Sequence, residues 1–392
     1  SSRRSLTLHL YIEGKYTACE TNDLRPDALA PFLDSAVAMA RAMTPDPYRE
    51  ITDPALYAGR EKRDLELFDP AVESVSPEER DRRASAVEAA ALEAAGERAI
   101  SAEASYEDEE AEVYQLHSNG FEGAKTGTQF WMSAELSLED EGDKRPSGWE
   151  LAGSRRRDGL PAAERVGRDT ATRARQRLGA RKIDTRRTAM IVENRVVSRL
   201  LGQVLAATSG RALQQKRSFL EDARGERFGS KLLDLTDDPF VPGGFGSRLF
   251  DSEGISARRL PVFAQGVFEN FYVDTYYGKK LKMAPTTGSS SNVVLTPKKR
   301  DLAGLVADAG DGILVRGFIG GNSNPVTGDF SLGVYGTLFE GGELGDAVAE
   351  MNIAGNHREL WRRLVAVGAD VWTHSRIRVP SLVFEDVQFS GL

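Results

Sequence analysis

The sequence predicts an α+β protein of two domains, on three observations. Residues 1–185 combine helical spacing with alternating strand-like runs, which is typical of helices on an antiparallel or mixed sheet. After Lys182 the pattern changes to short strands between glycine-rich turns, with few helices. A length of 392 residues with 40% hydrophobic content favours about two domains. We therefore expect an N-terminal α/β domain over 1–185 and a C-terminal β-rich domain over 186–392.

The N-terminal domain is expected to begin with a hairpin and a helix. Thr7–Tyr11 and Tyr16–Cys19 flank Gly14 as two strands, and the apolar residues between Leu29 and Ala40 then follow helical spacing. Further strands are expected at 101–107, 112–118, 126–138 and 147–154, with a turn at Gly120 and Gly123. A third helix is expected from Pro161 to Gly179.

The second helix has the clearest ends. Ser76 is placed to cap it, Pro77 suits its first position, and Glu79 is placed to complete a capping box. Gly96 stands just past its last apolar residue. We expect this helix to lie on the N-terminal sheet.

In the C-terminal domain three elements can be placed. Thr188–Val192 is expected to form a strand and Arg195–Thr208 a helix with an apolar stripe that includes Leu201 and Val204. A late helix is expected from Gly355 to Val367, ended by Gly368.

Charge is unevenly distributed along a chain of net charge −8. Glu97 to Glu112 is acidic, with four consecutive carboxylates at 107–110, whereas Gly153 to Arg187 is rich in arginine. The first interpretation is solvated helix faces and loops, and the second is contact with a partner or a peptide. Nucleic acid is an unlikely ligand because no aromatic residues are interleaved with the basic ones.

Other features bound the class of protein. The longest apolar runs are far shorter than the roughly 20 residues that span a bilayer, so no membrane segment is expected. The single cysteine, Cys19, cannot form an intrachain disulfide, and a cytoplasmic protein is expected. The chain opens at Ser1 without methionine or a secretory signal, which leaves open an upstream start with its own helix or strand.

Four ordered stretches in the C-terminal half carry a family resemblance. They are Thr236-Asp237-Asp238-Pro239, Phe250-Asp251-Ser252-Glu253-Gly254, the segment from Gly321 to Ser331, and Ile353-Ala354-Gly355-Asn356. With them the chain resembles the TldD/PmbA family, in its PmbA (TldE) branch. The resemblance covers nearly the whole chain, weakly in the first half.

The helix at 195–208 departs from the catalytic TldD branch. That branch carries HExxxH there, with two histidines that hold zinc and a glutamate that can act as general base. A gap-free pairing of 218–238 with that branch puts the motif on residues 201–206, where Leu201, Gly202 and Ala206 replace the three functional positions. The resemblance thus implies a chain with no catalytic residue, no metal and no cofactor of its own.

The resemblance also implies a division of labour. A PmbA-type subunit pairs with a TldD-like catalytic subunit, which carries the zinc, to form a cytoplasmic heterodimeric metallopeptidase. Family substrates are extended or unfolded peptides, in leader-peptide removal, peptide maturation or degradation. This chain would close one wall of the chamber and hold the substrate extended. A homodimer of the isolated chain is left open.

Residues outside that helix offer few other sites. The four histidines, His9, His117, His357 and His374, show no metal-ligand spacing, although a dispersed site stays open. His117 is expected to cap or pair within a strand, and His357 to lie in the first turn of the last helix. Cys19 is expected to be a small buried residue on a strand. The polar segment 286–291 lacks the pattern of a phosphate loop.

The glycine-rich segment 317–331 is the stronger positive signal. Its glycines allow positive backbone torsions, and its polar side chains offer donors and acceptors along a bent path, which suits peptide capture. The alternative is a tight hairpin whose side chains satisfy their own turn. The candidate substrate- or partner-facing residues are Thr286, Thr287, Asn322, Asn324, Thr327, Gly328, Asp329 and Ser331.

Three functions remain in competition. A noncatalytic peptidase subunit cleaves nothing until a TldD-like partner is added. An autonomous hydrolase with an unrecognised dispersed site is active alone and loses activity with a chelator. An interaction protein that modulates DNA gyrase, an older association of the family, or that binds nucleic acid shows salt-sensitive binding to DNA.

Overall fold

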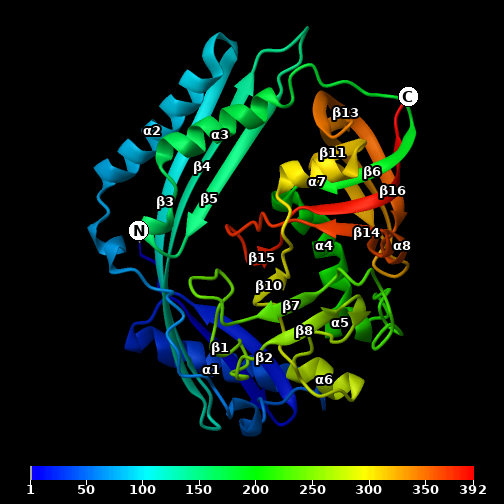
Figure 1. Cartoon of the computed structure of the whole chain (residues 1–392). Helices are drawn as coiled ribbons and strands as arrows, with labels where there is room; N and C mark the ends of the chain where they lie inside the picture. The colour runs from blue at the N-terminus through cyan, green and yellow to red at the C-terminus, as the bar shows by residue number, and fades with distance from the viewer. Residues whose placement is uncertain (1) are drawn as a thin grey trace.

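Four β-sheets organise residues 2–392, the part of the chain that this computed structural model describes (Figure 1). Two of them lie in the first half and two in the second, with helices packed on their faces. The predicted α+β class is confirmed. The predicted boundary at 185 falls in the connector between helix α3 and strand β6.

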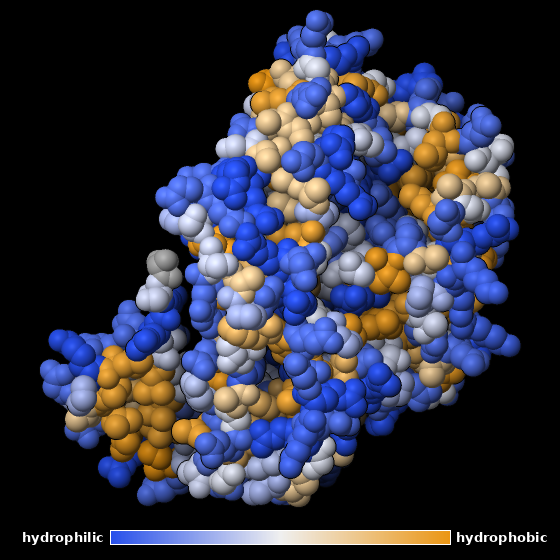
Figure 2. Space-filling view, turned by 60° about the vertical axis from the view of Figure 1, so that its left-hand side comes forward, coloured by the Kyte–Doolittle hydropathy of each residue, from blue (hydrophilic) through white to orange (hydrophobic). Residues whose placement is uncertain are grey.

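The N-terminal unit is a hairpin with one helix, as predicted. β1 (Leu6–Ile12) pairs antiparallel with β2 (Lys15–Thr21), and α1 (Pro26–Ala42) packs beside them. Gly14, at φ +74°, lies in the turn, where a side chain would be strained. Large apolar side chains such as Leu33 and Met39 remain exposed on this unit. Figure 2 shows hydrophobic surface gathered on the same lobe, beside the N-terminus.

The central sheet consists of three long antiparallel strands, β3 (Ala99–Leu116), β4 (Glu122–Leu138) and β5 (Ser147–Ser154). Two predicted strands, 101–107 and 112–118, are wrong as separate elements, because β3 runs without a break from 99 to 116. The four carboxylates at 107–110 lie in its middle, and the pairing with β4 continues through them. An edge strand tolerates such charges because solvent reaches one side of it.

Helices α2 (Pro77–Ala95) and α3 (Ala163–Arg175) pack against the central sheet. The predicted ends of α2 are confirmed, since Ser76 Oγ accepts from Glu79 N at 3.2 Å and Gly96 has φ +68°. The capping box is only half formed. The Glu79 carboxylate accepts from Arg83 at 2.9 Å and from Arg157, which draws it away from the helix start.

The C-terminal half contains the larger core. Its six-stranded sheet has the order β13-β12-β11-β6-β16-β14, and β13 also pairs with β16, which curves the sheet back on itself. A five-stranded sheet of order β15-β10-β7-β8-β9 lies beside it. The strands are β6 (Arg186–Val192), β7 (Leu235–Asp238), β8 (Leu260–Ala264), β9 (Val267–Phe268), β10 (Asn292–Leu295), β11 (Gly312–Ser323), β12 (Asp329–Glu340), β13 (Glu343–Asn356), β14 (Leu364–Val367), β15 (Ile377–Arg378) and β16 (Leu382–Ser390).

Helices of this half are mostly short. Helix α4 (Asn194–Ala207) matches its prediction to within a residue at each end. The others are α5 (Gly210–Gln214), α6 (Thr275–Leu281), α7 (Leu302–Ala309) and α8 (His357–Arg362). Within residues 2–392, none of the helices is long and apolar enough to cross a membrane.

The predicted late helix is wrong in length. It ends at Arg362, and Leu364–Val367 forms β14, paired antiparallel with β16. Leu364 and Val367 are buried in the C-terminal core, where pairing with β16 and burial outweigh local helical spacing.

Candidate functional site

Helix α4 lies with one side in the C-terminal core and the other toward solvent. Leu201 is fully buried, together with Leu200 and Val204. Ala206 is exposed, and a Cβ built at Gly202 would meet no atom within 4 Å. The helix is therefore held by its apolar stripe, and its outward positions 202 and 206 carry little or no side chain.

The residues of α4 do not fit a zinc ion. Leu201, Gly202 and Ala206 present no side-chain nitrogen, oxygen or sulfur, and zinc in proteins is bound by such atoms of His, Cys, Asp or Glu. Across residues 2–392, no three side chains of these four types gather closely enough to hold a metal ion. No step of a metal-assisted reaction can be assigned to this helix.

The one polar side chain inside the 201–206 motif is engaged by a distant histidine. Gln203 Oε1 lies 2.8 Å from His357 Nε2, at the first residue of α8. The His357 ring is fully buried between Phe219, at a centroid distance of 5.6 Å, and Phe330, at 4.9 Å. Burial lowers the pKa of His357 to about 4, so the ring is neutral at pH 7 and donates to Gln203. Its Nδ1 atom has no partner among the described residues.

The glycine-rich segment folds as the tip of the β11–β12 hairpin and lies against α4. Arg199 on α4 donates to the Gly320 carbonyl at 3.3 Å, and Phe219 N donates to the Pro325 carbonyl at 2.9 Å. His357 N donates to the Gly328 carbonyl at 2.9 Å. Helix α4, the hairpin tip and the start of α8 therefore form one continuous region of the surface.

Polar side chains of the hairpin tip mostly satisfy their own turn. Asn324 Oδ1 accepts from Val326 N at 2.9 Å, and Thr327 Oγ1 donates to Asp329 Oδ2 at 2.6 Å. Asn356 Nδ2 donates to Asp329 Oδ1 at 2.8 Å, and these bonds lower the pKa of Asp329. These contacts are those of the hairpin alternative. Several backbone groups of the tip are also bonded, such as the carbonyls of Gly320, Pro325 and Gly328, so its exposed side chains are what it offers to an outside ligand.

The remaining candidate residues lie at different places. Asn322 is exposed at the end of β11, Gly328 is exposed at φ +83°, and Ser331 Oγ lies 3.3 Å from the Asn352 side chain.

Two of the candidate threonines, Thr286 and Thr287, lie outside the hairpin, in the segment after α6. Thr286 Oγ1 donates to the Phe271 carbonyl at 2.8 Å, and Thr287 Oγ1 donates to Asp251 Oδ2 at 2.9 Å.

The other titratable candidates are scattered. His9 pairs with Tyr16 at 2.8 Å and His374 with the Gly153 carbonyl at 2.8 Å. His117 lies in the turn just after β3 rather than within a strand, and its ring contacts Tyr57 and Gln115. Cys19 is on β2 as predicted, but its side chain is only half-buried.

Sequence reasoning missed a charged cluster where the central sheet meets the start of α4. Arg173 on α3 contacts both Glu150, at 2.5 Å, and Glu193, at 2.9 Å. Arg195 contacts Glu150 at 3.0 Å, and Arg316 lies 3.5 Å from Glu193. Both carboxylates and Arg195 are buried. The five residues come from four separate segments, since only Glu193 and Arg195 are close in sequence, so no local pattern signals the cluster.

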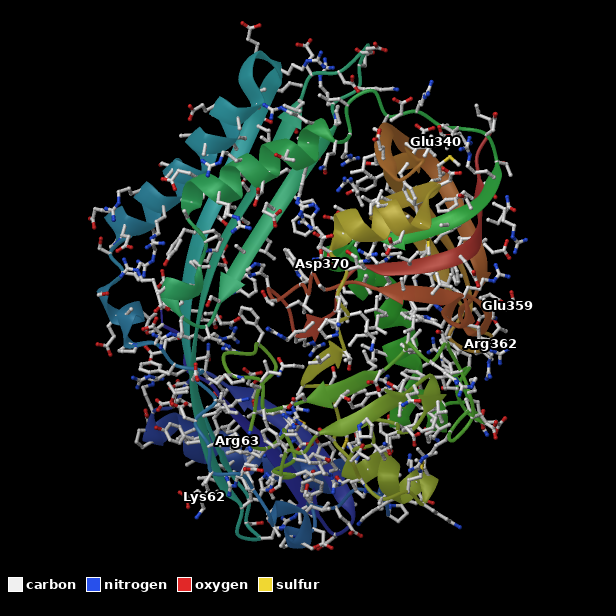
Figure 3. The ribbon with its side chains drawn as sticks, viewed as in Figure 1. Lys62, Arg63, Glu340, Glu359, Arg362 and Asp370 are labelled. Carbon is white, nitrogen blue, oxygen red and sulfur yellow. The ribbon has the colours of Figure 1, made fainter. Side chains whose placement is uncertain are left out.

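The start of α4 is also tied to a C-terminal loop. Asn194 Nδ2 donates to the Asp370 carbonyl at 2.5 Å, and Asn194 N donates to Ser381 Oγ at 3.0 Å. Figure 3 shows Asp370 at the middle of the molecule, between the two halves, whereas Glu359 and Arg362 on α8 lie at its outer side. The N-terminal end of α4 is therefore anchored from both halves of the chain.

Comparison with known proteins gives a consistent result. The family model described as the PmbA/TldA metallopeptidase C-terminal domain matches residues 185–391, and the model of the central domain matches residues 70–178. The chain is 29% identical to Metalloprotease PmbA of Escherichia coli O157:H7, over 100% of this chain and 86% of that protein. It is 29% identical to the Metalloprotease PmbA homolog of Haemophilus influenzae, over 99% and 86%.

Solved structures show the same likeness. A Bacteroides thetaiotaomicron protein, described as a candidate modulator of DNA gyrase, is 40% identical and superimposes with a TM-score of 0.96, over 99% of this chain and 88% of that one. TldE from Thermococcus kodakarensis superimposes with a TM-score of 0.86 at 21% identity, over 99% and 90%, which is a likeness of fold.

Proposed function

Because the chain belongs to the PmbA/TldA metallopeptidase family, we propose that it is a noncatalytic subunit of a two-chain peptidase. The single observation that supports this role best is the chemistry of α4. By the resemblance, Leu201, Gly202 and Ala206 correspond to the ligands and base of the catalytic branch, and none of the three has a side chain that can bind a metal or move a proton. The cutting chemistry then belongs to a TldD-like partner in the same cytoplasm.

The surface around α4 supports a role in partner or substrate contact. Ile319 and Val326, on the β11–β12 hairpin, are each 52% exposed, and Asn322 lies exposed near them. The network of Asn324, Thr327 and Asp329 holds this tip in one conformation. A prearranged tip with exposed apolar side chains suits docking, because less conformational entropy is lost on binding.

The substrates proposed are extended or unfolded peptides, as in leader-peptide removal or peptide degradation. An extended peptide can be held by main-chain hydrogen bonds to an exposed strand edge, such as the part of β11 just beyond Val315, where its pairing with β6 ends. Recognition of that kind tolerates many sequences, and a closed chamber excludes folded proteins.

The test is reconstitution. The chain is purified alone and together with the TldD-like protein of the same organism, and zinc content and cleavage of a neutral extended peptide are measured for each sample. We expect no stoichiometric zinc and no cleavage by this chain alone, and cleavage by the pair. Zinc with chelator-sensitive cleavage in the isolated chain would favour the autonomous hydrolase and overturn the proposal.

The hairpin tip is tested within the same assay. Val326→Asp is expected to weaken pairing or cleavage by about tenfold, since it places a charge in a docked apolar contact. Leu116→Asp is the matched control, because Leu116 is 72% exposed at the end of β3, in another part of the molecule. Equal effects of the two variants would remove the tip from the proposal.

The descriptions of two structural relatives supply the second candidate function. They are the protein from Bacteroides thetaiotaomicron and another from Thermotoga maritima, both described as candidate modulators of DNA gyrase. This function predicts a change in gyrase-driven supercoiling when the isolated chain is added without any peptidase partner. An unchanged rate of supercoiling would contradict this second function, and the role of a peptidase subunit would remain as the proposal.

A further inference from the structure

A cleft of about 410 Å³ opens between the two halves of the molecule, away from α4's outward face. The β4–β5 turn, the end of α3 and the connector to β6 form one side, and strands β12 and β13 form the other. Five cationic side chains line it: Lys144, Arg145, Arg177, Arg181 and Lys182. Two carboxylates, Asp140 and Glu350, line it as well. The lining is therefore strongly basic in a chain whose net charge is −8.

Several of these cations lack a carboxylate partner. Arg145 donates only to backbone carbonyls, of Gly142 at 3.2 Å and Lys144 at 2.8 Å. Arg177 donates to the Ser147 carbonyl at 2.7 Å and stacks over the Tyr335 ring at 4.2 Å. In the described part of the chain, Lys182 forms no ion pair. Such positive charges attract an anion without first giving up an existing pair.

The inner end of the cleft is also lined by arginine side chains. Arg177 and Tyr335 also line a smaller cleft, of about 30 Å³, with Arg173, Arg195 and Arg316. These three guanidinium groups face only two carboxylates, Glu150 and Glu193, so one positive charge is in excess. Burial lowers the pKa of Arg195 and of Arg316, which reflects the cost of holding these charges together away from water.

The walls of the cleft are held by backbone bonds. Arg181 N donates to the Ala347 carbonyl at 3.3 Å, and Ala349 N donates to the Arg181 carbonyl at 3.1 Å. The connector is thereby fixed to β13, so the backbone that carries the cations at 181 and 182 stays at the cleft. Fixed charges of one sign at a cleft raise the local concentration of an oppositely charged ligand.

We propose that this cleft binds an acidic segment of an extended peptide, with Arg145, Arg177 and Lys182 as its contacts. The inference rests on the proposed function and deepens it, because it names the class of substrate. The three cations come from two separate segments, the β4–β5 turn and the connector between α3 and β6, which suits several carboxylates spaced along a chain better than one compact anion. Tyr335 is the one aromatic ring in the lining of the larger cleft, and the Trp149 ring at its inner end is already stacked with Arg195, so successive nucleobases would find no stacking platform.

Fluorescence anisotropy of the isolated chain tests the cleft without any partner. The probes are two fluorescein-labelled ten-residue peptides, one of alternating Glu and Gly and the other of alternating Gln and Gly. We expect the acidic probe to bind at least tenfold more tightly at low salt and to lose affinity as salt is raised. Inorganic phosphate at equal charge concentration is expected to compete weakly.

Variants locate the binding. Arg145→Gln with Lys182→Gln removes two exposed cations without a carboxylate partner and is expected to weaken the acidic probe about tenfold. Lys231→Gln with Lys299→Gln is the matched control, because it removes two exposed lysines elsewhere and lowers the net charge equally. Urea unfolding of both double variants checks that neither change acts through the fold.

Three results would overturn the inference. They are equal affinity for the two probes, equal weakening by the two double variants, or tighter binding of a ten-nucleotide single strand than of the acidic peptide. None of these three results bears on the partner-dependent cleavage of a neutral peptide, which tests the proposed function separately. Conversely, failure of that cleavage assay leaves binding to the cleft measurable, so the two failures are distinguishable.

Discussion

Helix α4 and the cleft between the two halves differ in where their charge lies. Two outward positions of α4 are Gly202 and Ala206, and the one polar residue between them, Gln203, is hydrogen-bonded to a buried neutral histidine. The cleft collects cations from the β4–β5 turn and from the connector between α3 and β6, and several of them have no carboxylate partner. Positions 202 and 206 of α4 carry no reactive group, whereas charge capable of recognition is concentrated at the cleft.

This difference teaches that packing and surface chemistry are separable on one helix. The apolar stripe of α4 contributes to the C-terminal core whatever its outward side carries, so the outward residues contribute little to the stability of the fold. The charged cluster at the cleft is different, because its members depend on one another. Substitutions on the outward side of α4 should therefore change the free energy of unfolding little, whereas substitutions in the charged cluster should lower it strongly.

The largest effect is expected in the charged cluster. Glu193→Gln removes the carboxylate that contacts Arg173 and Arg316 and leaves three guanidinium groups facing Glu150 alone. Breaking a buried ion pair in this way costs about 3–5 kcal/mol in the free energy of unfolding. Urea unfolding at pH 7 measures it. Asp158→Asn, which breaks a surface pair with Arg156, is the control and should cost less than about 1 kcal/mol. Similar losses of unfolding free energy in the two variants would mean that the buried charges do not stabilise one another more than a surface pair does.

The next effect separates the two sides of α4. Leu201→Ala leaves a cavity in the C-terminal core and should cost about 3 kcal/mol in the free energy of unfolding. Ala206→Ser, on the exposed side of the same helix, should cost less than about 0.5 kcal/mol. Urea unfolding of both variants measures the difference. A small cost for Leu201→Ala would mean that the helix is not held by its apolar side.

A third effect depends on pH and concerns His357. Its pKa in the folded state is about 4, below the ordinary value near 6.5, so the unfolded chain binds a proton more readily. The stability from the neutral ring is complete above pH 6.5 and is lost as pH falls from 6.5 toward 4. At pH 5 the loss is about 2 kcal/mol. Asp237, whose pKa is raised to about 6 by burial, changes stability in the opposite direction over the same range.

Comparison with a variant isolates the histidine term. His357→Gln keeps a donor for Gln203 and removes the titrating ring, while Asp237 is present in both proteins and cancels in the difference. The difference in free energy of unfolding between the two proteins should shrink by about 2 kcal/mol from pH 7 to pH 5. A difference that stays constant with pH would mean that the ring is solvated or already charged.

The sequence allowed prediction where the signals are local. Ser76, Pro77 and Gly96 mark the ends of α2, and the apolar spacing of α4 gives its position to within a residue at each end. Locally misleading patterns explain the errors. The carboxylates at 107–110 resemble a loop but lie in an edge strand, and Leu364–Val367 follows helical spacing but pairs with β16. In both, pairing with a distant strand decides the conformation.

The functional surface was less predictable than the fold. Gln203 and His357 are 154 residues apart, and the members of the charged cluster range from Glu150 to Arg316. Only the folded chain brings such residues together. The hairpin at 317–331 could be foreseen from its glycines. Whether its polar side chains bind a ligand or one another depends on Asn356 and Asp329, which meet only through the pairing of β12 with β13.

The smallest expected effect concerns the outward side of α4 and has the opposite sign. Gly202 lies inside the helix with helical torsions and open space where a Cβ would stand, so Gly202→Ala should stabilise the protein by about 0.5–1 kcal/mol. Gly328→Ala is the contrasting control. It has φ +83°, and its Cβ would lie 3.1 Å from the Phe219 ring, so the same change there should destabilise. Gly202→Glu should likewise fold, because the position has room for a side chain. If urea unfolding shows that both Gly202 variants are less stable than the parent protein, position 202 has no room for a side chain. A steric restriction, rather than the absence of a chemical role, would then explain the glycine.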